Sequence, residues 1–170
     1  SYIYRCKSDA KNIGIIAAKE GTKIHGQIET GFLGGKKTKP YKIIKKWLDE
    51  NFPEHNDWIA EDSFCASQGY GGKIDLYSNN VFIDFKTKDN LKGKDPAKLV
   101  YDEHGMQLSA YGQGMGIDYP TRVSIFIDRK DTSIILFHIW DLESHNKHIE
   151  MFNSILKYWQ LVKNYEWDNV

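Results

Sequence analysis

The chain has 170 residues, enough for a domain with a full hydrophobic core, and we interpret residues 1–170 as a single domain. Apolar residues make up 41% of the sequence and charged residues 27%, which is ordinary for a globular protein. The 23 basic and 23 acidic residues cancel, so the composition excludes a protein that binds nucleic acid through a large overall positive charge, and any contact with a phosphate backbone must be local.

Composition also excludes several other classes of protein. No apolar run reaches the length that a membrane-spanning helix needs, and we find no signal-peptide pattern. Cys6 and Cys65 stand alone, so no disulfide framework, zinc site or iron–sulfur cluster is expected, although the two could pair. We therefore expect a protein with no membrane segment and an intracellular, reducing location.

Hydrophobic periodicity predicts two helices, three strands, a helix, two strands and a final helix. The expected ranges are 12–33, 40–51, 58–66, a hairpin over 72–86, 95–112, 122–128, 133–140 and 142–165. The last helix has an apolar stripe that we expect to be buried, formed by Ile149, Phe152, Ile155, Leu156, Trp159 and Val162. This order of elements predicts an α/β fold with a central mixed β-sheet flanked by α-helices.

The hairpin is the most informative segment, because its register places two carboxylates opposite each other. Asn79-Asn80 suits a two-residue turn, and that turn pairs Leu76 with Ile83 and Asp75 with Asp84. It likewise pairs Ile74 with Phe85, and Lys73 with Lys86. Directly opposed side chains have Cβ atoms about 4.5–5.5 Å apart, so the two carboxylates repel each other unless a proton or a divalent cation lies between them.

Two carboxylates and a lysine at one position of a sheet are typical of metal-assisted phosphodiester hydrolysis. Asp75 and Asp84 offer the hard oxygen ligands that Mg²⁺ or Mn²⁺ prefers, and the backbone carbonyl of Phe85 could add another. Lys86 could hold the attacking water or neutralise a phosphate oxygen. The alternative is a solvated hairpin face on which Lys86 pairs with Asp84. Glu61, on the preceding strand, could be an outer ligand or simply line the sheet.

Two residue pairs with helical spacing lie outside the hairpin, and each is weak evidence alone. His25 and Glu29 share one face of the first helix, and Gln107 and Tyr111 share one face of the helix after the hairpin. Lysines form two local runs that are either solvated faces or contacts for a phosphate backbone: Lys36, Lys37, Lys39, Lys42, Lys45 and Lys46, and then Lys86, Lys88, Lys92, Lys94 and Lys98.

Taken in order, these motifs resemble the PD-(D/E)xK nuclease superfamily, and within it the RecB-like exonuclease branch shared by phage and mitochondrial genome-maintenance exonucleases. The resemblance covers about half of the chain and rests on residues 21–29, 72–75, 83–88 and 107–111, which contain the sequences GTKIHGQIE, GKID, IDFKTK and QLSAY. It implies a restriction-endonuclease-like fold. The first aspartate follows Ile74 rather than proline, and the cysteines that bind a cluster in some relatives are missing, so no iron–sulfur cluster is expected.

The resemblance also implies roles for individual residues. His25, Asp75 and Asp84 would bind the metal ion, with Lys86 catalytic. Gln107 and Tyr111 would form the helix motif that supports the site and touches DNA, and Glu29 matches a position that is frequently acidic.

These observations together predict a DNA exonuclease that depends on Mg²⁺ or Mn²⁺ and acts at a free end of single- or double-stranded DNA. Recombination, replication or repair would fit, as would a phage, bacterial or organellar origin. Two alternatives stay open: a non-catalytic DNA-binding module and a sequence-specific endonuclease on the same fold. The sequence leaves the oligomeric state open.

Overall fold

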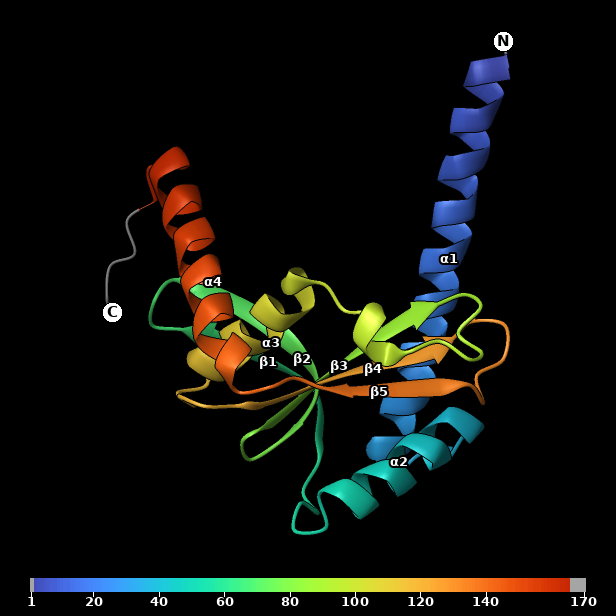
Figure 1. The fold of residues 1–170 in the computed structure, drawn as a ribbon, viewed down its shortest axis with the longest axis horizontal. Coiled ribbons are helices and arrows are strands. Elements are labelled where there is room, and N and C mark those ends of the chain that lie inside the picture. Colours follow the sequence, from blue (N-terminus) through green and yellow to red (C-terminus); the bar gives the residue numbers. More distant parts are fainter. Residues whose placement is uncertain (1, 166–170) are drawn as a thin grey trace.

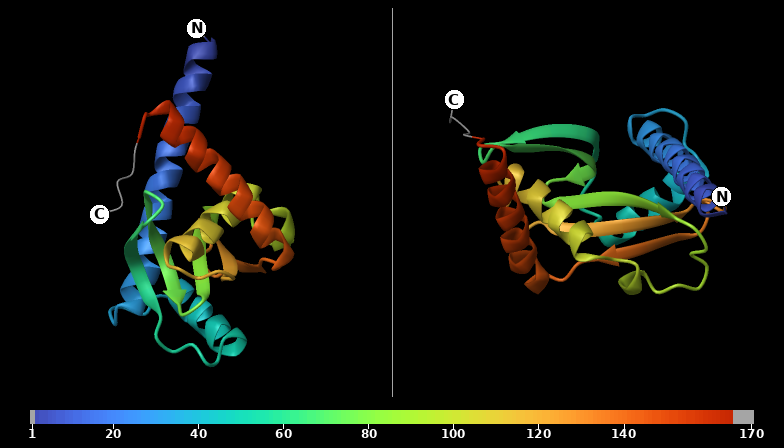
Figure 2. Two further views of the ribbon diagram at one scale, coloured as in Figure 1. Left: turned by 90° about the vertical axis from the view of Figure 1, so that its left-hand side faces the viewer. Right: turned by 90° about the horizontal axis from the view of Figure 1, so that it is seen from above.

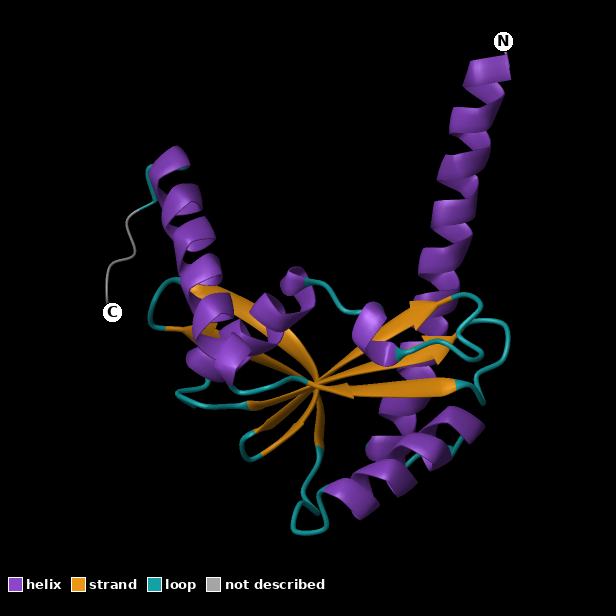
Figure 3. Cartoon of the chain, viewed as in Figure 1, coloured by secondary structure: helices purple, strands orange, loops and turns teal. Residues whose placement is uncertain are grey.

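The computed structural model describes residues 2–165, and their side chains from residue 14 onward. It has the expected α/β fold, a central mixed β-sheet with flanking helices (Figures 1 and 3). The elements are α1 (Tyr2–Phe32), α2 (Lys39–Asn51), β1 (Ile59–Ala66), β2 (Tyr70–Ser78), β3 (Val81–Lys88), the 3₁₀ helix η1 (Pro96–Lys98), α3 (Asp102–Gly114), β4 (Thr121–Asp128), β5 (Ile135–Ile139) and α4 (Glu143–Val162).

The five strands lie in the order β1-β2-β3-β4-β5. Only β3 and β4 are parallel, and the segment that connects them contains η1 and α3, as a parallel connection requires. Side chains of α1 and α2 pack on one face of the sheet, where Ile28, Ile44 and Leu48 are fully buried. On the other face, Leu108 of α3 packs against Phe82. The central strand β3 is therefore covered on both sides, and every residue from Val81 to Phe85 is buried.

Two expected helices have different bounds in the structure. α1 begins at Tyr2, ten residues before the expected start. The single helix expected over 95–112 is instead a short 3₁₀ turn followed by α3, because the backbone of Tyr101 is extended, with φ −127° and ψ 157°. Leu91 and Leu99 bury their side chains against Phe126 of β4, which ties this connecting segment to the sheet and interrupts the helix.

The prediction of a buried apolar stripe along α4 was wrong. Ile155, Trp159 and Val162 are 54%, 43% and 58% exposed, whereas the fully covered side chains of this helix are His145 and His148, near its start. Figure 1 shows the beginning of α4 lying against α3. Further along, α4 contacts the end of the β1–β2 hairpin, where Phe152 packs on Tyr70 and Gln160 donates to the Gln68 carbonyl, so most apolar side chains of its second half face solvent. Over the described residues, no helix is long and apolar enough to cross a membrane.

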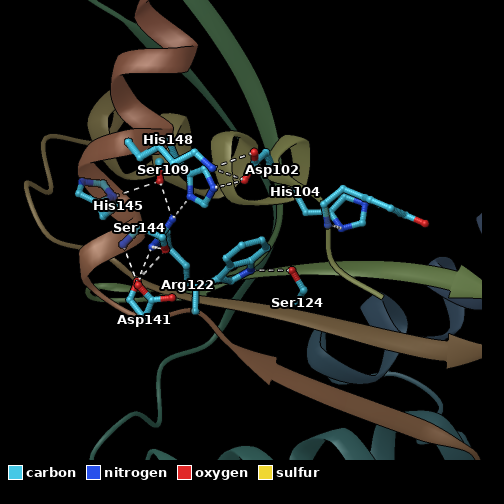
Figure 4. A network of polar contacts seen from close by, with 12 residues as sticks. Asp102, His104, Ser109, Arg122, Ser124, Asp141, Ser144, His145 and His148 are labelled. Atoms are coloured by element: carbon cyan, nitrogen blue, oxygen red, sulfur yellow. Dashed lines mark hydrogen bonds and ion pairs between the residues drawn. The ribbon is translucent and has the colours of Figure 1, made fainter. Parts of the chain in front are cut away.

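A buried arginine fastens α3 and α4 to the sheet (Figure 4). Arg122 of β4 is 1% exposed. Its Nη1 donates to Ser109 Oγ at 3.0 Å and to His148 Nδ1 at 2.8 Å, and its Nη2 donates to the Asp141 carbonyl and to Ser144 Oγ. One guanidinium group thus satisfies acceptors from α3, from α4 and from the segment that leads into α4, and it holds α3 in place over the sheet.

We predict that Arg122→Met lowers the free energy of unfolding by about 3 kcal/mol, because the acceptors that the guanidinium satisfies stay buried without a donor. Urea denaturation followed by circular dichroism measures the change. The control is Lys130→Met, which removes an exposed cation from the segment between β4 and β5 and should cost no more than about 0.5 kcal/mol. Equal stability of the two variants would contradict the role given to Arg122.

Candidate active site

The hairpin of β2 and β3 has the predicted register near its turn. Leu76 pairs with Ile83, Tyr77 with Phe82 and Ser78 with Val81. Asn79, in the turn, has a φ of 48°, in the left-handed region that asparagine tolerates. These pairs confirm the predicted turn and fix which residues follow on each strand.

Beyond the Leu76–Ile83 pair the two strands separate, which differs from the prediction. Asp75 and Asp84 are not paired through their backbones; instead Asp75 Oδ2 accepts a hydrogen bond from the Phe85 backbone N–H at 2.8 Å. Ile74 does not pair with Phe85 either, because Ile74 packs in the core under α3 and Phe85 in the core under α1. Figure 2 shows the β1–β2 pair lying apart from the other three strands. The carboxylates therefore lie where the sheet divides.

The neighbouring strand β1 is irregular at the same level. Glu61 lies between the Ala60–Leu76 and Asp62–Ile74 pairs, across from Asp75, and its φ of 57° is rare for a residue other than glycine. Its carboxylate forms an ion pair with Lys73. The prediction that Lys73 lies opposite Lys86 was wrong, because Lys73 is bound to Glu61 instead. Burial is the main reason why the pKa of Asp75 is raised, and the negative charge of Glu61 adds to it, so Glu61 belongs to the electrostatic environment of the site.

Lys86 links the buried aspartate to helix α3. Its Nζ donates to Asp84 Oδ1 at 2.8 Å and to Gln107 Oε1 at 3.2 Å, and Gln107 Nε2 donates in turn to the Tyr111 hydroxyl at 2.5 Å. The structure thus brings together Asp84, Lys86, Gln107 and Tyr111. Burial raises the pKa of Tyr111 to about 12, so this hydroxyl stays protonated at neutral pH.

Asp84 is a carboxylate in an unfavourable environment. It is 2% exposed, and its second oxygen, Oδ2, is buried without a hydrogen-bond partner. The pKa of Asp84 is raised to about 6: burial is the main cause, Lys86 opposes it, and the negative charge of Asp75 adds to the rise. Burial also raises the pKa of Asp75, against the hydrogen bond from Phe85 and the charges of His25 and Lys86. Both carboxylates therefore lack part of the compensation that a buried charge needs.

Helix α1 brings His25 and Glu29 to the edge of this site. The His25 ring packs edge-on against the Phe85 ring, with centroids 6.0 Å apart, and its charge lowers the pKa of Asp75. Glu29 lies one turn further along the helix. The pKa of Lys73 is raised mainly by Glu61, and the negative charge of Glu29 adds to this rise. The structure therefore places His25 near Asp75, and Glu29 near the Glu61–Lys73 ion pair.

The donor set suits a hard divalent cation, although the ligands are not all assembled. Carboxylate oxygens are the ligands that Mg²⁺ and Mn²⁺ prefer, and the unpaired Asp84 Oδ2 is an acceptor that a cation would satisfy. Among the residues that the structure describes, however, no three His, Cys, Asp or Glu side chains are grouped closely enough to hold a metal. The two aspartates thus fit the predicted cation, while coordination by His25 and by the Phe85 carbonyl stays a prediction.

Comparisons with known proteins give a likeness in fold. No protein-family model matches the chain, and no curated protein matches it. Among solved structures, a “putative exonuclease” from Eubacterium rectale is 13% identical, with a TM-score of 0.55 over 86% of this chain and 69% of that one. A second structure, SSO0001, is 19% identical over 89% and 69% of the two chains, but its TM-score of 0.40 is too low to support an argument. At such identities the first likeness shows the fold alone.

We predict that Asp84→Asn stabilises the metal-free protein at pH 8. In the folded state the pKa of Asp84 is about 6, above its ordinary value of 3.8, so the aspartate loses stability as pH rises from about 4 to 6 and carries the full cost above that window. The uncharged amide avoids this cost. The free energy of unfolding of the variant should exceed that of the wild type by about 1–3 kcal/mol at pH 8 and by little at pH 4.

Urea denaturation in EDTA at both pH values measures this difference. The matched control is Asp57→Asn, which changes an exposed aspartate and should leave the wild-type pH dependence unaltered. A variant at position 84 that is less stable than the wild type at pH 8 would mean that the buried charge is fully compensated by Lys86.

Proposed function

We propose that this protein is a DNA exonuclease that depends on Mg²⁺ or Mn²⁺ and belongs to the RecB-like branch of the PD-(D/E)xK nucleases. The observation that carries the proposal is the buried Asp84, with one oxygen bound to Lys86 and the other unpaired, beside Asp75 at the division of the sheet. The Eubacterium rectale neighbour is named a “putative exonuclease”, and this name supports the same class of reaction on this fold.

In this proposal Asp75 and Asp84 hold the cation, with His25 and the Phe85 carbonyl as further ligands. A bound divalent cation supplies two effects, a lower pKa for a water molecule and neutralisation of charge on the scissile phosphate. An imidazole ligand suits Mn²⁺ better than an all-oxygen site does, so Mn²⁺ should support activity at least as well as Mg²⁺. We give Glu29 a supporting role, because its negative charge, after that of Glu61, helps to raise the pKa of Lys73.

Lys86 is the residue best placed to act on a phosphate oxygen. Its ammonium group donates to Asp84 and Gln107, and a further N–H remains for the substrate. The hydrogen bond between Gln107 and Tyr111 fixes the amide that orients Lys86, so the helix motif acts by positioning this cation. A held ammonium group stabilises the negative charge that develops on a phosphate during hydrolysis.

Lysines of both local runs form contacts within the protein. In the first run, Lys45 and Lys46 form ion pairs with Asp49 and Glu50 one turn further along α2. In the second run, Lys88 Nζ donates to the Leu99 carbonyl and lies over the Tyr101 ring. Both runs are therefore partly used within the protein. The proposal places the DNA contact mainly at the site itself, which agrees with the zero net charge.

We predict that Lys86→Ala and Asp84→Asn each abolish cleavage of linear DNA, because one removes the cation at the phosphate and the other removes a metal ligand. Gel assays with linear and covalently closed circular DNA, in Mg²⁺, Mn²⁺ or EDTA, measure the activity. Lys92→Ala, which changes an exposed lysine of the same run, is the control and should cleave at the wild-type rate.

Three results distinguish the candidate functions. Cleavage of linear but not circular DNA supports the exonuclease, and cleavage of both supports the endonuclease. DNA binding without metal-dependent cleavage supports the non-catalytic module. If Lys86→Ala cleaves DNA at the wild-type rate, Lys86 takes no part in the reaction.

We also predict that Mg²⁺ or Mn²⁺ raises the Tm of the wild type but not that of Asp84→Asn, since a ligand that binds only the folded state stabilises it. Thermal denaturation without DNA measures this directly. The exposed control Asp57→Asn should show the wild-type increase. An equal increase for all three proteins would place the cation elsewhere.

A further inference from the structure

The second half of α4 exposes a row of apolar side chains with a regular spacing. Ile155, Tyr158 and Val162 are each more than half exposed, and the partly buried Met151 precedes them by one turn. Successive members of this row are four, three and four residues apart, so they lie along one side of the helix. These four side chains are called the α4 stripe below.

Contacts that hold this part of α4 to the rest of the chain lie on another side of the helix. The Phe152 ring packs on the Tyr70 ring, with centroids 4.8 Å apart, and Gln160 Nε2 donates to the Gln68 carbonyl at 3.1 Å. Because Phe152 and Gln160 are eight residues apart, they share one side of α4 and fix its orientation against the β1–β2 hairpin. Figures 1 and 2 show α1 at the opposite end of the molecule, so α1 does not cover the α4 stripe either.

The spacing of the α4 stripe is the one by which a helix packs against a second helix. Steps of four and three residues in alternation form the seam of a coiled coil, where each apolar side chain enters a hole between four side chains of the facing helix. From Met151 to Val162 the seam is about 17 Å long, at 1.5 Å of helix per residue. A facing helix is therefore the partner that this surface fits.

The α4 stripe is uncharged, and this property selects among partners. Lys157 is the one charged residue between Met151 and Val162 in the sequence, and its place next to Tyr158 puts it on another side of the helix. A DNA backbone is bound through cations, so the stripe does not suit the substrate of the proposed nuclease. Two identical apolar surfaces can meet without repulsion between like charges. A second copy of the chain therefore satisfies the requirement that a symmetric interface be complementary to itself.

The exposed apolar area is large enough for a dimer. Trp159 and Leu161 flank the α4 stripe and are 43% and 63% exposed. Together with the stripe they offer on the order of 500 Å² of apolar surface in each copy. Two copies would therefore bury on the order of 1,000 Å², which is about the lower limit for a specific protein–protein interface. Tyr158 and Trp159 are also of the residue types that are enriched in such interfaces.

We propose that the protein forms a symmetric dimer in which the α4 helices of two copies pack against each other along the α4 stripe. The dimer gives the exposed side chains of α4 an apolar environment that a single chain does not provide. The proposal does not rest on the proposed nuclease activity, because no residue of the stripe belongs to the candidate active site.

Analytical ultracentrifugation of the wild type over a range of about 1–300 µM measures the assembly. We expect a dimer with a Kd of about 10 µM, because an interface of this size is a small one and gives modest affinity. Tyr158→Glu places two carboxylates in the interface, one from each copy, and should weaken the dimer at least about tenfold.

The matched control is Lys157→Glu, which introduces the same side chain at the neighbouring exposed position, outside the α4 stripe, and should dimerise as the wild type does. Circular dichroism of both variants in dilute solution should match that of the wild type, because both positions are exposed. If Tyr158→Glu does not fold, Ile155→Gln tests the same seam with a neutral side chain and should weaken the dimer about tenfold.

Two results would overturn the proposal. A wild type that stays monomeric over the whole concentration range would show that the α4 stripe does not bind a second copy. A dimer that is unchanged in Tyr158→Glu and Ile155→Gln would show that two copies meet through another surface. Because the measurement needs neither metal nor DNA, its result is independent of the nuclease assays.

Discussion

A carboxylate that is buried without full compensation is the constraint on which the rest of this structure depends. Asp84 lies on the central strand, covered by helices on both faces of the sheet, and only one of its oxygens has a partner. A protein whose only requirement was stability would replace this side chain with an apolar one, since burying a charge is costly. The cation site that we propose would explain this cost.

Two helices, α3 and α1, supply the side chains that surround Asp84 from outside the sheet. α3 supplies Gln107 and Tyr111, and the buried Arg122 holds α3 and α4 against β4. α1 supplies His25 and lies against the end of β3, where a Cβ atom on Gly21 would be 2.8 Å from Thr87 Oγ1. The position of Lys86 therefore depends on packing between segments that are far apart in the sequence.

Local patterns predicted the elements well where one interaction decides the structure. The Asn79-Asn80 turn fixed three strand pairs, and helical periodicity placed α2. Periodicity failed for α4, because an apolar stripe does not show where the sheet beneath it ends. It also failed after Asp95, where burial of Leu91 and Leu99 against β4 outweighs the local preference for a helix.

The site was predictable only in part, for the same reason. The hairpin spacing indicated Asp75, Asp84 and Lys86, whereas the expectation that Gln107 and Tyr111 support the site followed from the resemblance to a nuclease superfamily. The hydrogen bond from Lys86 to Gln107 was not predicted. Separation of β2 and β3 beyond Leu76 was not visible in the sequence, since alternation alone predicts continued pairing. Glu61 was considered as a possible outer ligand, but its ion pair with Lys73 gave no local signal, because it depends on the pairing of β1 with β2.

The central claim is that Asp75 and Asp84 jointly bind one divalent cation. Anomalous diffraction from crystals grown with Mn²⁺ tests it most directly. The account predicts a strong peak within bonding distance of an oxygen from each aspartate, absent from crystals of Asp84→Asn. A wild-type map without a peak between these carboxylates, or with its peaks only at other residues, would contradict the account.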